Sequence, residues 1–240
     1  MNSGTPADAT VTVQLENEPA IWMKLDGRAL GQYAKALARG WSLLGLSKGD
    51  KVAIFDYGSS PATYLASSAF FPHLQHGAAD ILGCLAICCD GVPQMLPRLT
   101  SVLRYVKPRA VFLRADALPP FEQLARSEDI EIARHTGFIV VTQDEGFMRA
   151  QSMKDWQQRL GLPVYSMLRI DRSLFLAMEC PACHTFHTWS DLYDVRVSDG
   201  GQLAVKPAFA THGQEYVSPI MAELSGEACD KGQSDKRIIL

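Results

Sequence analysis

The stretch DGRALGQYAKALARGWSLLGLSKGDKVAIFD, residues 26–56, predicts a helix, a turn and a strand in succession. Apolar side chains recur at every third or fourth position and form one stripe along a helix over 26–45, at Leu30, Tyr33, Leu37, Trp41 and Leu44. Asp26 is suited to cap the start of this helix, and Gly45 is suited to end it. The apolar run after Lys51 indicates a short buried strand.

This alternation continues to about residue 172. Strands are expected over 85–89, 109–113, 138–142 and 163–167, and helices over 60–71, 76–83, 94–106, 120–127 and 148–160. Helices that alternate with short apolar strands predict an α/β fold with a mainly parallel sheet flanked by helices. After residue 173, strand-like runs between turn signals predict a small antiparallel β region. We therefore expect an α/β core over 1–172 and a β region over 173–240, irregular from Ser225 on.

Composition and charge exclude several classes of protein. The 240 residues carry 23 Lys+Arg and 26 Asp+Glu, a net charge of -3, which offers no broad positive surface for nucleic acid or an anionic membrane. The first twenty residues lack the pattern of a secretory signal, and no apolar run reaches the ~18 residues of a membrane-spanning helix. Six cysteines are too few for a disulfide scaffold. We expect a cytoplasmic protein with no nucleic-acid and no membrane partner.

The most informative cluster is CPACHTFH, residues 180–187. Cys180 and Cys183 form a Cys-x-x-Cys turn, and His184 or His187 can return to the same ion. Structural zinc takes four sulfur or nitrogen ligands, and Cys229 is the only other cysteine toward the end of the chain, so a zinc site is predicted. The alternatives are two buried thiols that only pack, or a redox pair, which normally lies at a strand-to-helix junction.

Several stretches, taken in order, resemble the phenylacetate–CoA ligase family of the adenylate-forming (acyl-CoA synthetase) superfamily. They are GLSKGDKV at 45–52, LGLPVY at 160–165, Met178-Glu-Cys180 followed by His187, LYDVRV at 192–197 and GQLAV at 201–205. The resemblance implies an adenylate-forming fold in which Tyr165 would stack on adenine. It also implies a pocket for an aromatic acyl group or a CoA thioester.

The three motifs that would bind ATP depart from the family. The nearest match to its phosphate loop, NSGTPAD at 2–8, has Pro6, which lacks an N–H, and Asp8, whose carboxylate would oppose a phosphate. Arg169 stands where the family has a magnesium-binding glutamate, although a guanidinium can pair with an anionic ligand. Glu227 would replace a ribose-binding aspartate. These departures make ATP and CoA doubtful cofactors and leave open whether the chain is an enzyme.

The resemblance also implies a ligand set for zinc. Zinc-bearing members of the family bind the ion through a cysteine and a histidine near this position and a later pair of cysteines. Carried onto this sequence, the set is Cys180, Cys183, His187 and Cys229, with His184 in reserve. The family's segment before the phosphate loop and its mobile C-terminal domain, which supplies a catalytic lysine, are not expected in this chain.

The leading hypothesis is a non-catalytic or degenerate zinc-containing subunit that resembles the core of an aryl-CoA ligase. It would bind an acyl or CoA ligand, or act as a scaffold in a larger complex, and no catalytic residue is assigned. We expect a homo-oligomer or a hetero-complex with an enzyme subunit, because the missing domains would leave apolar surface exposed. The alternative is an active split ligase whose lysine domain is on another chain. A zinc-ribbon nucleic-acid binder is disfavoured by the acidic balance.

Overall fold

The computed structural model describes residues 9–13, 21–144, 150–209, 215–226, 229 and 236–240. In these residues the α-helices are α1 (Gly27–Leu43), α2 (Pro61–Tyr64), α3 (Ala78–Leu82), α4 (Leu96–Val106), α5 (Leu118–Ser127) and α6 (Ala150–Leu160). The short 3₁₀ turns are η1 (Pro93–Met95), η2 (Ala115–Ala117), η3 (Ile132–Arg134) and η4 (Asp171–Ser173).

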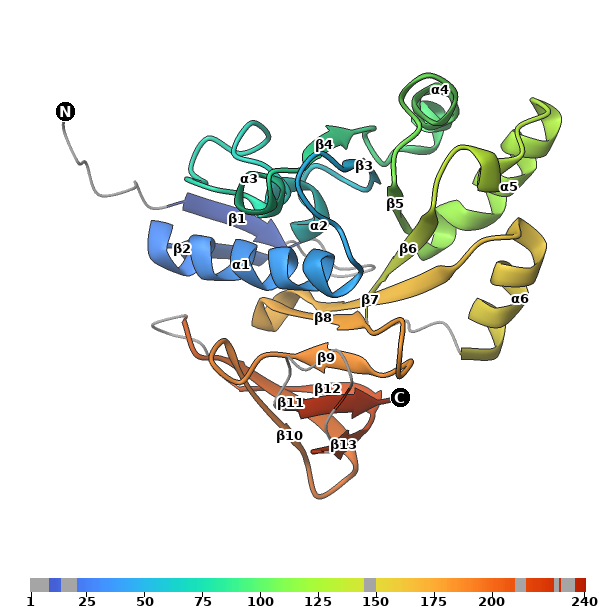
Figure 1. Cartoon of the computed structure of the whole chain (residues 1–240). Coiled ribbons are helices and arrows are strands. Elements are labelled where there is room, and N and C mark those ends of the chain that lie inside the picture. The colour runs from blue at the N-terminus through green and yellow to red at the C-terminus, as the bar shows by residue number, and fades with distance from the viewer. Residues whose placement is uncertain (1–8, 14–20, 145–149, 210–214, 227–228, 230–235) are drawn as a thin grey trace, which may run out of the picture.

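The strands form three sheets (Figure 1). A hairpin pairs β1 (Ala9–Val13) with β2 (Ile21–Leu25), and a three-stranded antiparallel sheet holds β10 (Tyr193–Val197), β11 (Gln202–Pro207) and β12 (Tyr216–Met221). The large sheet has the order β13-β14-β9-β8-β7-β6-β5-β3-β4. Its members are β3 (Lys51–Phe55), β4 (Leu85–Cys88), β5 (Ala110–Arg114), β6 (Phe138–Gln143), β7 (Val164–Ile170), β8 (Phe175–Glu179), β9 (Phe186–Thr188), β13 (Glu223–Ser225) and β14 (Lys236–Ile239).

The large sheet changes from parallel to antiparallel at β7. Strands β3 to β7 pair in parallel, whereas β7 pairs antiparallel with β8, and the pairs from β8 to β13 are also antiparallel. The mixed α/β fold, the parallel sheet flanked by helices and the small antiparallel sheet confirm the expected fold class. Residues 172 and 173 lie in the turn η4 between β7 and β8, which pair with each other in the large sheet. The division into two domains stays a prediction.

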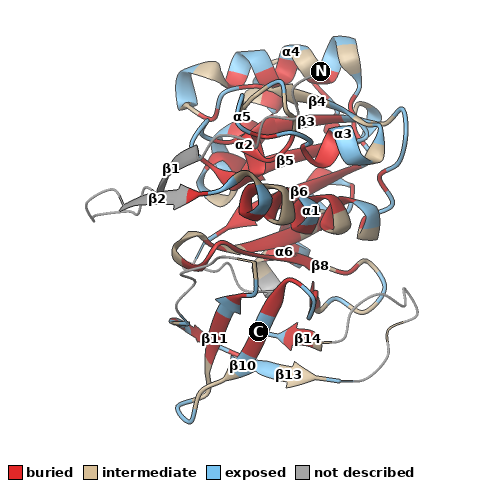
Figure 2. Ribbon diagram, turned by 90° about the vertical axis from the view of Figure 1, so that its left-hand side faces the viewer, coloured by how far each residue is buried: buried red, intermediate tan, exposed pale blue. Residues whose placement is uncertain are grey.

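Both faces of the central parallel strands β3, β5 and β6 are buried, as Figure 2 shows for the layer between the helices. Val52 and Ile54 belong to the apolar cluster that includes α1 and α3, whereas Ala53 and Phe55 belong to the one that includes α4, α5 and α6. Successive side chains of a strand point to opposite faces, so an unbroken apolar run is what a sheet covered on both sides requires. Helix α1 forms as predicted, because Asp26 accepts a hydrogen bond from the Ala29 amide at 2.6 Å.

Three local expectations were wrong. The helix expected over 60–71 ends at Tyr64, and the chain then turns so that the amides of Ala78 and Ala79 donate to the carbonyls of Leu65 and Ala66. The strand expected to be buried at 85–89 lies at the edge of the large sheet, where Leu85 is 55% exposed. The region after Ser225, expected to be irregular, contains β14, which lies between β13 and β9. No described helix has the length and apolar character to cross a membrane.

Gly91 holds the turn after β4 against the end of β3. Its amide donates to the Asp56 carbonyl at 3.0 Å, and a Cβ there would lie 2.4 Å from the Asp56 carbonyl carbon. Since that neighbour is backbone, Gly91→Ala is expected to destabilise the fold by about 1–3 kcal/mol in urea unfolding.

Gly31→Ala is the control, because nothing lies within 4 Å of its Cβ position in α1. It should stabilise the chain by about 0.5–1 kcal/mol. Equal effects of Gly91→Ala and Gly31→Ala on stability would contradict a steric conflict between position 91 and the Asp56 backbone.

Candidate metal centre

The turn between β8 and β9 presents two cysteines and a histidine to one point. The Cys180 amide donates to the Thr185 carbonyl and the His184 amide to the Cys180 carbonyl, each at 2.9 Å, so the loop is closed by its own backbone. His184 adopts a left-handed conformation (φ 54°) that tightens this turn. His187 follows on β9 opposite Met178 of β8, and it is 1% exposed. The turn therefore fixes the positions of Cys180, Cys183 and His187 together.

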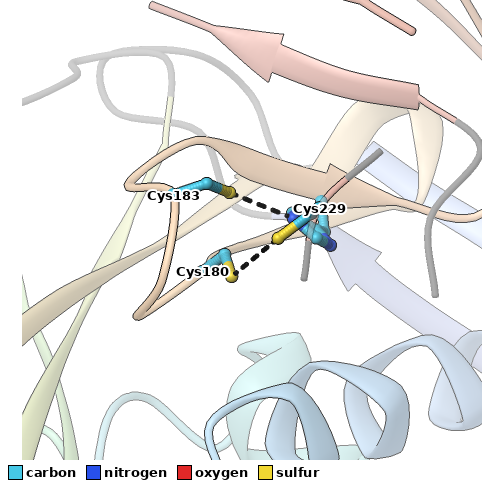
Figure 3. A group of neighbouring side chains, drawn as sticks. Cys180, Cys183 and Cys229 are labelled. Atoms are coloured by element: carbon cyan, nitrogen blue, oxygen red, sulfur yellow. Dashed lines mark hydrogen bonds between the residues drawn. The ribbon is translucent and has the colours of Figure 1, made fainter. Parts of the chain in front are cut away.

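Cys229 reaches this turn from a distant part of the sequence. It lies between β13 and β14, and β14 pairs with β9 so that Arg237 stands opposite His187. Figure 3 shows the side chains of Cys180, Cys183 and Cys229 converging. The ligand atoms of these three cysteines and His187 all lie within 4.8 Å of one another. The structure thus brings together the four residues that the sequence suggested as a set.

The spacing fits a tetrahedral ion. The Cys180 and Cys229 sulfurs are 3.7 Å apart, and the Cys183 sulfur is 3.3 Å from His187 Nε2. Zinc–sulfur bonds of about 2.3 Å at tetrahedral angles put neighbouring sulfurs roughly 3.8 Å apart. Three sulfurs and one imidazole form a donor set that soft or borderline metals prefer. The cluster could therefore hold a metal ion.

The two cysteines of the turn differ in acidity. Burial raises the pKa of the Cys180 thiol to about 11. Burial also acts to raise the pKa of Cys183, but hydrogen bonds with Thr185, His187 and Cys229 outweigh it and lower this pKa to about 5. The Thr185 hydroxyl lies 3.0 Å from the Cys183 sulfur. A thiolate is the form that binds metal, so Cys183 is prepared for that role by its own turn.

His184, the reserve ligand, is engaged elsewhere. Its Nδ1 lies 3.3 Å from Glu179 Oε1, and its side chain is 64% exposed. The other Glu179 oxygen accepts a hydrogen bond from the Ser166 amide of β7 at 2.8 Å. Glu179 thereby links the turn between β8 and β9 to the neighbouring strand β7.

Of the three residues predicted to bind a nucleotide, the structure describes Tyr165 and Arg169, both on β7. Tyr165 packs edge-on against Phe138, with ring centroids 5.8 Å apart. Arg169 lies four residues further along β7, roughly 13 Å away at the rise of a strand. Glu227 and the stretch 2–8 lie outside the described residues.

Arg169 belongs to a buried polar cluster that sequence reasoning missed. Asp56 Oδ2 accepts hydrogen bonds from Ser60 Oγ and Thr142 Oγ1, each at 2.9 Å, and from Arg169 Nη1 at 3.3 Å. Asp56 is fully buried, and the Arg169 side chain is 12% exposed. Burial alone would lower the pKa of Arg169, but Asp171 and Asp56 raise it above its usual value. The available signal was an aspartate directly after an apolar strand, because polar groups gather at the carboxyl ends of parallel strands.

Comparison with known proteins gave structural matches alone. No family model matches the chain, and no curated protein matches its sequence significantly. A 2-hydroxyisobutyryl-CoA ligase, solved in complex with 2-HIB-AMP and CoA, superposes with a TM-score of 0.78 at 17% identity. The match covers 96% of this chain and 55% of that one. The fold is that of the adenylate-forming acyl-CoA ligases.

Two further solved structures share this ligase fold. The anthranilate CoA ligase AuaEII, in complex with anthranoyl-AMP, has a TM-score of 0.62 at 10% identity and is matched over 95% of this chain and 46% of its own. The N-terminal subdomain of NpsA from Klebsiella oxytoca, in complex with anthranilyl-AMSN, has a TM-score of 0.59 at 14% identity, over 95% and 63%. The chain spans about half the length of the ligases it matches.

Proposed function

We propose that this chain is a zinc-stabilised, non-catalytic relative of the aryl-CoA ligases that binds an acyl-CoA thioester as a component of a larger complex. The fold of the acyl-CoA ligases supports the choice of ligand class. Support for the non-catalytic role comes from one observation, the burial of Arg169 against Asp56.

The ion pair of Arg169 argues against nucleotide chemistry at this strand. By the resemblance, Arg169 replaces a glutamate that would bind magnesium, and a fixed cation repels that ion. Its guanidinium is also held by Asp56 and Ser60, with Asp171 Oδ2 3.8 Å from its Nε. Because carboxylates already compensate the charge of the Arg169 guanidinium, this side chain would attract a triphosphate only weakly. The position therefore favours a structural role.

Zinc is the ion we propose for the four-residue cluster. Sets of three cysteines and one histidine are typical of structural zinc sites, in which no coordination position remains open for a substrate. Three protein residues and a bound water would be expected of a catalytic zinc instead. The four ligand atoms within 4.8 Å of one another support a closed, structural site.

An exchange assay and a binding assay test this function on the full chain. With Mg²⁺, ATP and benzoate, phenylacetate, anthranilate or 2-hydroxyisobutyrate, we expect no ATP–pyrophosphate exchange above a protein-free blank. Calorimetric titration with benzoyl-CoA is expected to show saturable binding at one site. Exchange by the chain alone would contradict the non-catalytic role, and the absence of heat with acyl-CoA thioesters would contradict the ligand class.

The second candidate is an active split ligase, favoured by the fold shared with ligases that were solved with 2-HIB-AMP or anthranoyl-AMP. In that case a separate polypeptide would supply the lysine domain, and exchange would begin only when this partner is added. The ion pair of Arg169 weighs against it. Native mass measurement of the chain purified from its source distinguishes a homo-oligomer from such a hetero-complex.

A further inference from the structure

A groove lies at the amino ends of three neighbouring parallel strands. Its volume is about 410 Å³, and it is lined by the segments that precede β3, β5 and β6. These strands are adjacent in the sheet, so residues 49–51, 107–109 and 133–137 meet along one edge although they are distant in sequence. The groove involves neither the metal cluster nor the buried pair of Asp56 and Arg169.

The charge of the groove is opposite to that of the whole chain. Its lining includes Lys51, Lys107, Arg109 and Arg134, together with His135, against the single carboxylate of Asp50. The chain as a whole has a net charge of -3. Four cations around one concave surface concentrate positive potential there, and this attracts polyvalent anions.

Two of the cations are committed to neighbouring groups. Lys51 Nζ donates to the Val106 carbonyl at 3.3 Å, at the end of α4, and Arg134 pairs with Glu131 at 2.6 Å. Lysine at the end of a helix also offsets the negative pole of the helix dipole. A ligand of this groove would therefore bind mainly to Lys107 and Arg109.

Lys107 and Arg109 are the least engaged of the four cations. Both side chains are exposed, and within the described part of the chain no carboxylate lies within ion-pair distance of Lys107. Arg109 Nε lies 3.8 Å from Asp50 Oδ2, a loose ion pair that is longer than a hydrogen bond and compensates part of the charge of Arg109. Pro108 between them is buried, and the Arg109 amide donates to the Lys51 carbonyl at 2.8 Å, so the backbone that carries both cations is fixed.

We propose that this groove binds a small molecule that carries two linked phosphates. A guanidinium donates two parallel hydrogen bonds to one phosphate, and an ammonium supplies a compact charge to the next. A volume of about 410 Å³ lies within the usual range of small-molecule sites, and it is too small for a nucleic-acid duplex. The proposal is independent of the acyl-CoA function, because it rests on other residues at the amino edge of the sheet.

Titration with inorganic pyrophosphate tests the site. We expect the wild-type chain to bind one pyrophosphate in low salt, and the double variant Lys107→Asn/Arg109→Gln to bind it at least tenfold more weakly. Asparagine is chosen because Lys107 has φ of 51°, a left-handed conformation that asparagine tolerates. Lys154→Gln, at an exposed lysine of α6, is the matched control and should bind like the wild type.

Amide chemical shifts locate the bound pyrophosphate on the chain. Pyrophosphate should shift the amide resonances of residues 49–51, 107–109 and 133–137. It should leave those of residues 180–187, at the candidate metal centre, unchanged. Equal affinity for sulfate would show attraction to charge alone and overturn the proposal. So would a double variant that loses thermal stability but binds pyrophosphate normally, since the cations would then only stabilise the end of α4.

Discussion

Replacing Cys229 with serine is expected to abolish zinc binding and to lower the melting temperature by about 8–16 °C. Cys229 and Cys180 are 49 residues apart, and the ion would join them as a cross-link. In the chain-entropy model a cross-link of this span stabilises the folded state by about 4 kcal/mol. At about 2–4 °C per kcal/mol for a chain of this size, that loss gives the stated shift. Elemental analysis and calorimetry measure both effects.

Cys88→Ser is the matched control for this variant. Cys88 is a half-buried thiol on the edge strand β4, and it does not belong to the metal cluster. It should keep one zinc per chain, with a small change in melting temperature. Removing the ion from the wild type with a chelator should reproduce the shift of Cys229→Ser. A Cys229→Ser chain that retains stoichiometric zinc would exclude Cys229 as a ligand. One that melts with the wild type would exclude the stabilising cross-link that the ion is expected to form.

The second large effect is expected at the buried pair of Asp56 and Arg169. Arg169→Met should destabilise the chain by about 3–5 kcal/mol, because it leaves the Asp56 carboxylate buried without its cation. Asp56→Leu should have a comparable cost, since Arg169, Ser60 and Thr142 all lose their acceptor. The double variant should cost less than the sum of the two, because it leaves neither charge unpaired.

Urea unfolding of the wild type, the two single variants and the double variant measures the coupling free energy between Asp56 and Arg169. The control is Arg196→Gln, which breaks the pair of Arg196 with Glu215 on the surface. That pair is solvated, so its loss should produce no measurable change in stability. Strict additivity of the two buried substitutions would mean that Arg169 does not depend on Asp56. In that case the main argument for a structural role of Arg169 would fail.

Local patterns in the sequence predicted much of the fold. The apolar stripe of α1 and the largely apolar strands β5 and β6 carry their signals within single elements, since burial on one or both faces dictates the spacing of apolar residues. The edge position of β4 was not predictable in this way. Its residues are as apolar as those of β5, and only the order of the strands decides which one has a single neighbour.

The C-terminal strand β14 was not predicted from the sequence, for a different physical reason. β14 has four residues, and its stability depends on pairing with β9 on one side and β13 on the other. A segment so short gives no periodic signal of its own. The candidate metal site shows the same division. The Cys-x-x-Cys turn was visible locally, whereas the approach of Cys229 depends on where β14 pairs.

The buried cluster of Asp56 could be anticipated only in part. An aspartate after an apolar strand and a serine before Pro61 were each visible, and Ser60 does cap α2. Their meeting with Thr142 and Arg169 depends on the register of β3, β5, β6 and β7 across the sheet. Register is set by the packing of the whole sheet, which a single sequence does not display.

The position of β14 has a consequence for biosynthesis. This strand follows β13 in the chain, yet it lies between β13 and β9 in the sheet. While the chain is being translated, the outer edge of β9 stays open until residue 239 has emerged, and an open edge is a template for pairing with other nascent chains. A premature stop only a few codons before that point would leave both β9 and β13 exposed, and such a product should aggregate.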